Sequence, residues 1–215
     1  MSRSLLFPAG SLAVSLLLVV SLTGCAQESN VTGSPGVTSA PAIQLDAAGG
    51  DLKTIYIAGG CFWGLEKYIG LVHGVVATEV GYANGGSASA TYGDGSGYAE
   101  AVKVVYDPTV APLPFLLDLF YDAIDPVSVN RQGNDVGTEY RTGIYYTDSA
   151  DKAVIEKSLG QLQKAYARPI AVESGPLINY SPAEEYHQDY LQKHPRGYCH
   201  IPQKLFDAAA AARPE

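Results

Sequence analysis

From Asp51 onward, segments with the apolar pattern of a strand take turns with segments that have the apolar pattern of a helix. Runs rich in β-forming residues predict strands at 52–58, 75–82, 141–147 and 170–174, and clean alternation of apolar residues predicts a strand at 99–106. Apolar residues three and four positions apart predict helices at 61–72, 113–124, 149–167 and 183–194. Because strands and helices interleave without a strict βαβ repeat, we expect an α+β fold. Its form would be a two-layer sandwich, a mixed β-sheet flanked by helices with a ferredoxin-like core.

The segment before Asp51 has a different character. Arg3 precedes the apolar run 11–22, which is short for a transmembrane helix and closes with Leu22-Thr23-Gly24-Cys25. This ending resembles a bacterial lipobox, in which a signal peptide, here 1–24, is cleaved and the cysteine, here Cys25, is lipidated. An uncleaved membrane anchor and an ordinary signal peptide are the alternatives.

Residues 25–50 carry Ser, Thr, Gly, Pro and Ala without an apolar period, which predicts a flexible tether. We therefore expect one domain at 51–203, a C-terminal tail at 204–215, and attachment to a membrane through the lipid on Cys25. The lipobox resemblance implies the bacterial cell envelope. Ala26 after the cysteine favours the outer membrane, with the domain facing the periplasm.

Composition narrows the function classes. Apolar residues make up 47% and charged residues 17% of the 215 residues, which is typical of a globular domain. The net charge of −8 offers no basic surface, so we expect no nucleic-acid partner. The three cysteines, Cys25, Cys61 and Cys199, cannot all pair with one another and need separate explanations.

Cys61 follows a strand and two glycines and opens a helix. The free N–H groups and the dipole of a helix N-terminus favour a thiolate, the reactive form of cysteine. Gly59 and Gly60 allow a sharp turn and the close approach of a substrate, and Phe62 and Trp63 offer an apolar wall beside the sulfur. An inert buried cysteine at a strand end is the alternative.

Glu100 lies at the end of an apolar strand face. Alternation places it on the same face as Val102, Val104 and Tyr106. A carboxylate there is poorly solvated, so its pKa would rise and it could carry a proton at neutral pH. A strand-end glutamate turned toward water is the alternative, and the pattern alone favours that alternative.

Several motifs follow one another in the order of one enzyme family. They are Gly60-Cys61-Phe62-Trp63-Gly64, Gly81–Gly85, Ala99-Glu100 with the strand to Pro108, Asn130–Asp135, Gly137-Thr138, Tyr140-Arg141, Ala183–Tyr190 and Gly197-Tyr198-Cys199. Together they resemble the A-type peptide methionine sulfoxide reductases over about residues 52 to 203. The resemblance implies reduction of methionine (S)-sulfoxide, free or in proteins, and repair of oxidised proteins.

The resemblance also implies a role for each site residue. Cys61 corresponds to the nucleophile, Glu100 to the proton donor and Cys199 to the recycling cysteine. The implied substrate-binding residues are Phe62 and Trp63 at the S-methyl group, Tyr92 and Tyr140 at the sulfoxide oxygen, and Asp135 and Tyr190, which order the pocket.

The implied chemistry needs no metal and no organic cofactor. A sulfoxide oxygen leaves only when protonated, which explains the acid and the hydroxyl donors. Attack by Cys61 leaves methionine and a sulfenic acid, which Cys199 converts to a disulfide. A thioredoxin-like dithiol would then reduce the disulfide.

Three features depart from the family pattern. Tyr98 stands where a histidine is usual, and Glu139 replaces a common glutamine. The stretch between Tyr92 and Glu100 is several residues shorter than usual, so the position of the Tyr92 hydroxyl depends most on the structure of this loop.

Other functions have weaker support. His187, His194, Cys199 and His200 match no common metal-ligand spacing, and a structural hydrogen bond is favoured for His187. A thiol peroxidase would share the two cysteines but would need neither an aromatic methyl pocket nor a carboxylic acid. A non-catalytic lipoprotein would keep Cys61 and Cys199 as a stabilising disulfide, which leaves the acid and the aromatic wall unexplained.

Overall fold

The computed structural model describes residues 51–87 and 89–214. The expected signal peptide 1–24, the lipidation site Cys25 and the tether 25–50 therefore lie outside the described residues. Within the described part of the chain, no helix has the length and apolarity needed to cross a membrane.

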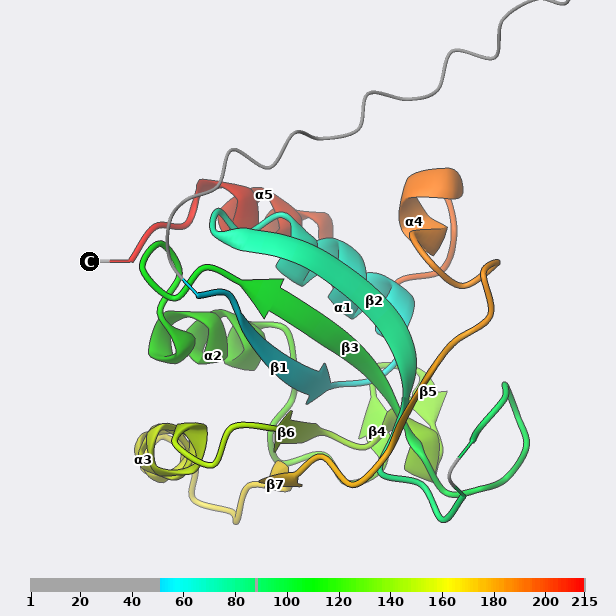
Figure 1. The fold of residues 1–215 in the computed structure, drawn as a ribbon, viewed down its shortest axis with the longest axis horizontal. Helices are drawn as coiled ribbons and strands as arrows, with labels where there is room; N and C mark the ends of the chain where they lie inside the picture. Colours follow the sequence, from blue (N-terminus) through cyan, green and yellow to red (C-terminus); the bar gives the residue numbers. More distant parts are fainter. Residues whose placement is uncertain (1–50, 88, 215) are drawn as a thin grey trace, which may run out of the picture. The chain divides into compact units, whose positions relative to one another are not determined.

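A six-stranded sheet organises the domain (Figure 1). In order across the sheet, its strands are β7 (Glu173–Pro176), β6 (Gly143–Tyr146), β1 (Lys53–Ala58), β3 (Ala99–Tyr106), β2 (Val75–Ala83) and β8 (Tyr180–Pro182). β6 and β7 are parallel and the other neighbours are antiparallel, so the sheet is mixed. A separate two-stranded hairpin consists of β4 (Arg131–Gln132) and β5 (Asp135–Val136).

The helices are α1 (Phe62–Gly70), α2 (Leu113–Asp122), α3 (Asp151–Gln163), α4 (Tyr190–Lys193) and α5 (Gln203–Ala211), with a 3-10 turn η1 at Thr138–Tyr140. The chain runs β1-α1-β2-β3-α2-β6, and these strands lie in the order β6-β1-β3-β2. Two interleaved βαβ units of this kind define the ferredoxin-like arrangement. The expected α+β fold is thus confirmed.

Alternation along the strands separates the two faces of the sheet. Ile57 of β1 and Val102 of β3 point into the main core, where they pack with buried residues of α1 such as Leu65. The opposite face carries a smaller cluster of Tyr56, Ala58, Ala83, Ala99, Ala101 and Tyr145. Burial of one large aliphatic side chain contributes about 1.5–3 kcal/mol, so the larger cluster fixes α1 firmly against the sheet.

The prediction of a helix at 183–194 is mostly wrong, because only one turn near its end, α4, is helical. The side chain of Gln188 accepts from Val80 N–H and donates to Val80 O, both at 2.9 Å, which ties the segment to the edge of β2. Asp189 has a φ of +52°, outside the helical region, so α4 can begin only at Tyr190. Tertiary hydrogen bonds override the helical pattern here.

Two C-terminal boundaries also differ from expectation. The strand expected at 170–174 lies at Glu173–Pro176, since Ala171 N–H donates to Pro126 O outside the sheet. The tail expected at 204–215 contains most of α5, whose Phe206 is buried in the main core. The domain therefore extends beyond residue 203.

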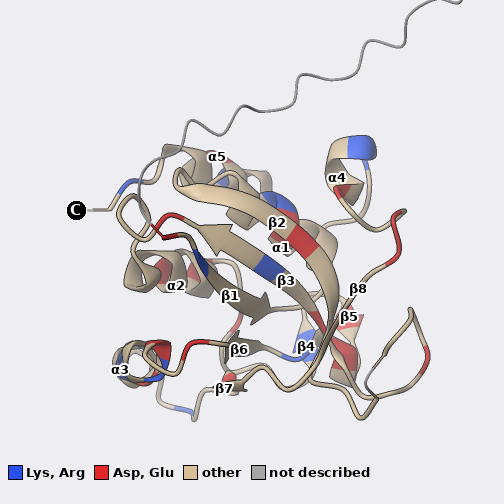
Figure 2. Cartoon of the chain, in the orientation of Figure 1, with Lys and Arg blue, Asp and Glu red and all other residues tan. Residues whose placement is uncertain are grey.

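Charged residues of both signs are interspersed over the domain (Figure 2). Lys103 of β3 lies 3.5 Å from Glu79 of β2. At the start of β1, Lys53 contacts Asp148 at 3.0 Å and Asp151 at 2.7 Å. These pairs place basic groups next to acidic ones on the sheet and at the start of β1.

Candidate active site

The register of the sheet brings the segment after β1 next to the start of β3. Ile57 stands opposite Val102 in this antiparallel pair, so the turn that follows β1 faces Glu100. α1 begins directly after the turn, with Cys61 as its N-cap residue. Sheet pairing thus joins two segments that lie far apart in the sequence.

Two glycines make this turn possible. Gly60 has a φ of +80°, a conformation that favours glycine. A Cβ atom at Gly59 would lie 2.7 Å from Ile124 Cγ2, and one at Gly60 would lie 2.6 Å from Gln132 Cβ. The turn can therefore pack closely only without side chains, and it leaves Cys61 8% exposed at the start of α1.

The charge state of Cys61 differs from the expectation that the helix N-terminus makes it a thiolate. Burial raises the pKa of the thiol above its usual range, and the nearby charge of Glu100 raises it further. The hydrogen bond from Trp63 N–H lowers the pKa, but burial is the larger effect. Without a substrate the sulfur is therefore a protonated thiol at neutral pH.

Glu100 is only 2% exposed, so the alternative of a solvent-facing glutamate is wrong. Its Oε2 accepts a hydrogen bond from Phe62 N–H at 3.0 Å. Burial raises the pKa of Glu100 to about 8, and the charges of Asp135 and Glu139 also raise it, although the bond from Phe62 opposes them. At pH 7 the carboxyl holds its proton and can act as an acid.

Aromatic rings surround the start of α1. Trp63 stacks on Tyr190, with ring centroids 3.8 Å apart and planes 16° apart. The indole Nε1–H donates to His187 Nδ1 at 3.1 Å, which is the structural hydrogen bond expected for His187. The ring of Phe62 is buried and lies 5.2 Å from the His187 ring. Together these rings provide an apolar wall that suits a methyl group.

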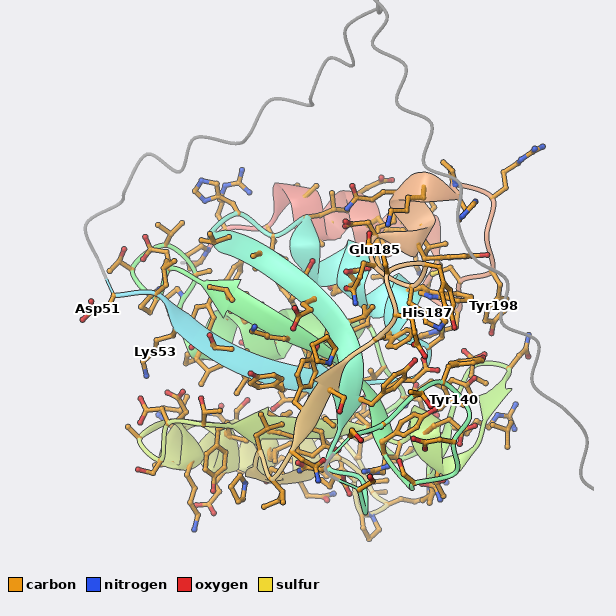
Figure 3. The ribbon with its side chains drawn as sticks, turned by 45° about the vertical axis from the view of Figure 1, so that its right-hand side comes forward. Asp51, Lys53, Tyr140, Glu185, His187 and Tyr198 are labelled. Carbon is orange, nitrogen blue, oxygen red and sulfur yellow. The ribbon has the colours of Figure 1, made fainter. Side chains whose placement is uncertain are left out.

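Tyr92 and Tyr140 lie at the same end of the domain as this wall. The Tyr92 ring lies 4.9 Å from the His187 ring despite the shortened loop, and Figure 3 shows Tyr140 and His187 at the end opposite Lys53. Burial raises the pKa of both tyrosines, and negative charge on Glu100 contributes in both cases. Both side chains are therefore within electrostatic reach of the acid.

Cys199 lies against α1. Both Cys61 and Cys199 are free thiols. A Cβ atom at Gly64 would lie 2.8 Å from Cys199 Sγ. Glycine costs a helix about 1 kcal/mol relative to alanine, and at Gly64 it leaves room for the second sulfur. Asp135 of β5 accepts a hydrogen bond from Tyr198 Oη at 3.3 Å, so it contacts the same segment.

This arrangement combines a thiol, a protonated carboxyl and two tyrosines around an apolar wall. It can donate protons to an oxygen atom while the thiol sulfur attacks the atom that carries it. Among the described residues, no group of three or more His, Cys, Asp or Glu side chains could hold a metal ion.

Known proteins are similar in sequence to this chain over nearly all of the described domain. The family model for "Peptide methionine sulfoxide reductase" matches residues 53–213. The peptide methionine sulfoxide reductase MsrA of Lachnoclostridium phytofermentans is 55% identical over 164 residues, which cover 74% of this chain and 99% of that protein. The chain belongs to the A-type peptide methionine sulfoxide reductase family.

Other members of the family agree with this assignment. The MsrA of Clostridium perfringens is 53% identical over 154 residues, covering 70% of this chain and 98% of that protein. Reduced Mxr1 from Saccharomyces cerevisiae is 37% identical with a TM-score of 0.66, covering 70% of this chain and 91% of that one. Methionine sulfoxide reductase A of Corynebacterium diphtheriae is 36% identical with a TM-score of 0.62, covering 71% and 84%.

Two of the three departures from the reductase pattern, Tyr98 and Glu139, act at the site. Tyr98 Oη accepts a hydrogen bond from Gly93 N–H at 2.8 Å and so closes the shortened loop. Its ring packs 4.4 Å from that of Tyr82. Glu139 adds a negative charge that raises the pKa of Glu100, which a glutamine would not do. Tyr98 thus supports the loop, and Glu139 helps the acid to keep its proton.

Sequence reasoning missed two glutamates that organise the site. Glu66 on α1 is 3% exposed, and its Oε2 accepts from Asp189 N–H at 2.9 Å. Burial raises the pKa of Glu66 to about 7, with the Asp189 charge adding to the effect. Glu184 Oε2 accepts from Tyr82 Oη at 2.7 Å, and its Oε1 accepts from Tyr92 N–H at 3.2 Å.

A signal for one of them was present in the sequence. Glu66 comes four residues after Phe62 and three before Ile69, so helical spacing places it on the buried face of α1. A glutamate at such a position needs a polar partner. No comparable pattern marks Glu184, which lies in the segment that was expected to be helical.

Proposed function

We propose that this reductase acts on the S epimer of methionine sulfoxide, free or within proteins, with Cys61 as the nucleophile and Glu100 as the acid. The observation that carries this proposal is the buried, protonated Glu100 carboxyl, which accepts from the N–H of the residue after Cys61. A nucleophile and an acid held together are what the removal of a sulfoxide oxygen requires.

The aromatic wall and the two tyrosines orient the substrate. The S-methyl group packs against Phe62 and Trp63, while the sulfoxide oxygen faces Glu100, Tyr92 and Tyr140. Transfer of a proton to that oxygen develops positive charge on the substrate sulfur. This charge lowers the pKa of the neighbouring thiol, so Cys61 becomes a thiolate only when substrate is present.

The first step is a two-electron reduction of the substrate. Cys61 Sγ first bonds to the oxygen-bearing sulfur of the protonated sulfoxide. The hydroxyl then moves from that sulfur to Sγ, so the substrate S–O bond and the new S–S bond both break while an S–O bond forms on Cys61. Methionine leaves, and Cys61 becomes a sulfenic acid. The Cys199 thiol then condenses with the sulfenic acid, which forms a disulfide and releases water. A thioredoxin-like dithiol reduces this disulfide and restores both thiols.

An assay on separated sulfoxide epimers tests the proposal. With dithiothreitol as reductant, the protein should convert the S epimer and leave the R epimer, and Cys61→Ser should convert neither. Rapid turnover of hydrogen peroxide without turnover of either epimer would instead identify a thiol peroxidase. Equal rates on both epimers would refute the proposed geometry of the methyl and oxygen sites.

We further propose that the reductase is a lipoprotein of the bacterial envelope, attached through Cys25 and facing the periplasm from the outer membrane. The support is the lipobox resemblance of Leu22-Thr23-Gly24-Cys25 and the tether composition of 25–50. Two or three acyl chains hold a protein firmly on a membrane.

Expression of the full chain and of Cys25→Ala, followed by membrane fractionation and mass spectrometry, tests this anchor. The parent should carry acyl groups on Cys25 and sediment with membranes, whereas the variant should be neither acylated nor cleaved before position 25. A parent chain that retains residues 1–24 and carries no acyl group would refute the proposal.

A further inference from the structure

The segment that carries Cys199 has two faces, and each docks on a different element. Cys199 faces α1 at Gly64, as described above. His200 faces the opposite way: a Cβ atom at Gly60 would lie 2.9 Å from His200 Cε1, and one at Gly133 would lie 2.9 Å from His200 Cβ. The imidazole therefore fills the space between the turn before Cys61 and the β4–β5 hairpin.

One ring nitrogen of this imidazole, Nδ1, faces Asp135. His200 Nδ1 lies 3.5 Å from Asp135 Oδ2, the same oxygen that accepts from Tyr198 Oη at 3.3 Å. The His200 side chain is only 5% exposed, and among the described residues neither ring nitrogen makes a hydrogen bond, so the 3.5 Å approach to Asp135 is an electrostatic contact. A buried imidazole without partners costs stability, so its approach to Asp135 is the contact that compensates for burial.

The charge state of His200 suits a neutral imidazole whose N–H faces the Asp135 side chain. Burial lowers the pKa of His200, although the Asp135 charge and the main chain of Gly59 oppose this. The imidazole is then neutral at pH 7 and can donate its Nδ1–H to Asp135. Tyr198 and His200 are the two sequence neighbours of Cys199, and both contact Asp135.

We propose that His200 is a positioning residue for disulfide formation: through Asp135 it holds Cys199 beside α1 while Cys199 attacks the Cys61 sulfenic acid. This role rests on the proposed function. It belongs to the second step only, in which the S–S bond forms, the S–O bond breaks, and the hydroxyl leaves as water with the Cys199 proton. We call the contacts of Tyr198 and His200 with Asp135 the clamp. The first step, the reduction of the sulfoxide, does not use it.

Two substitutions separate the polar contact from the filling of space. His200→Asn retains an amide N–H close to the position of Nδ1, whereas His200→Leu fills the pocket without a donor. Tyr198→Phe removes the second contact with Asp135. Because Tyr198 is 43% exposed, this variant should change the stability of the fold least. His73→Ala, at an exposed histidine in the turn after α1, controls for loss of an imidazole elsewhere.

Reduced protein is mixed with methionine (S)-sulfoxide, quenched at intervals, and assayed for methionine and for free thiols. In His200→Leu, methionine should form at the rate of the parent while thiol loss slows about tenfold, as expected when a polar contact with a charged group is lost. Tyr198→Phe should show the same split with a smaller effect. His200→Asn should recover most of the second rate, and His73→Ala should match the parent.

Three results would overturn the clamp: slowing of both steps together, no slowing of thiol loss in His200→Leu and Tyr198→Phe, or equal slowing in His200→Asn and His200→Leu. Failure of the proposed function gives a different result, since the parent itself would form no methionine. In that case the Cys61 sulfenic acid can be generated with hydrogen peroxide, and the same comparison of thiol loss still tests the clamp.

Discussion

Replacement of Glu100 by glutamine tests the buried acid directly. The amide oxygen of glutamine can still accept the hydrogen bond from Phe62 N–H, which is 3.0 Å long in the parent. The shape of the side chain is retained, but its acidic proton is lost. The substitution therefore removes the acid and leaves the turn around Cys61 in place.

The magnitude of the effect on stability follows from the pKa. Glu100 has a pKa of about 8 in the folded protein against an ordinary value of 4.5. Because the folded value is raised, unfolding at pH 5–7 releases a proton, and stability falls as pH rises through this window. At about 1.4 kcal/mol per pH unit, the parent should lose about 2 to 3 kcal/mol from this group between pH 5 and pH 7.

The assay compares urea unfolding of the parent and Glu100→Gln at pH 5 and pH 7. Other groups contribute equally to both proteins, so the variant should lose about 2 to 3 kcal/mol less over this interval. In single turnover at pH 7, its reduction of methionine (S)-sulfoxide should be about 10²–10⁴-fold slower. Glu156→Gln, at an exposed glutamate of α3, should change neither quantity.

Equal pH dependence in Glu100→Gln and the parent would mean that Glu100 is already ionised in the folded protein. Equal single-turnover rates would mean that another group protonates the sulfoxide oxygen. Either result would refute the assignment of Glu100 as the proton donor. The unfolding measurement and the rate measurement can each contradict it without the other.

Three further predictions concern the surroundings of this acid. Cys199→Ser should form one equivalent of methionine per protein and stop as a Cys61 sulfenic acid that dimedone labels; full turnover with thioredoxin would contradict it. Glu66→Leu should raise KM about tenfold and shift the emission of Trp63, the only tryptophan, because Asp189 N–H loses its acceptor, while Glu66→Gln should resemble the parent in both. Glu139→Gln should lower the pKa of Glu100, as followed by carbon-13 NMR of labelled glutamate; an unchanged pKa would exclude an electrostatic role.

Local patterns were sufficient where local forces decide the structure. β3 occupies the predicted 99–106, because alternating apolar residues can satisfy only one register on a buried face. The same alternation put Glu100 on that face, but the pattern alone favoured a side chain turned toward water, so its burial was not predicted from it. The helix at 183–194 failed because Gln188 bonds to the edge of β2, an interaction that no local pattern reveals.

Charge states were harder to predict than positions. The start of α1 was predicted at Cys61, but the pKa of its thiol depends on how deeply the completed core buries it. The contact of His200 with Asp135 likewise joins residues 65 positions apart in the sequence. Such groups meet only through the packing of α1 against the C-terminal segment, which composition and periodicity do not encode.

The split order of the strands also governs when this chain becomes an enzyme. Cys61 follows β1, Glu100 belongs to β3, and Cys199 follows the last strand, so no N-terminal fragment that ends before residue 199 contains all three. In a nascent or unfolded chain, Cys61 is an ordinary thiol with a pKa near 8.5, without an acid beside it. Recovery of reductase activity during refolding should therefore lag behind recovery of helical circular dichroism, which makes turnover a direct readout of completed folding.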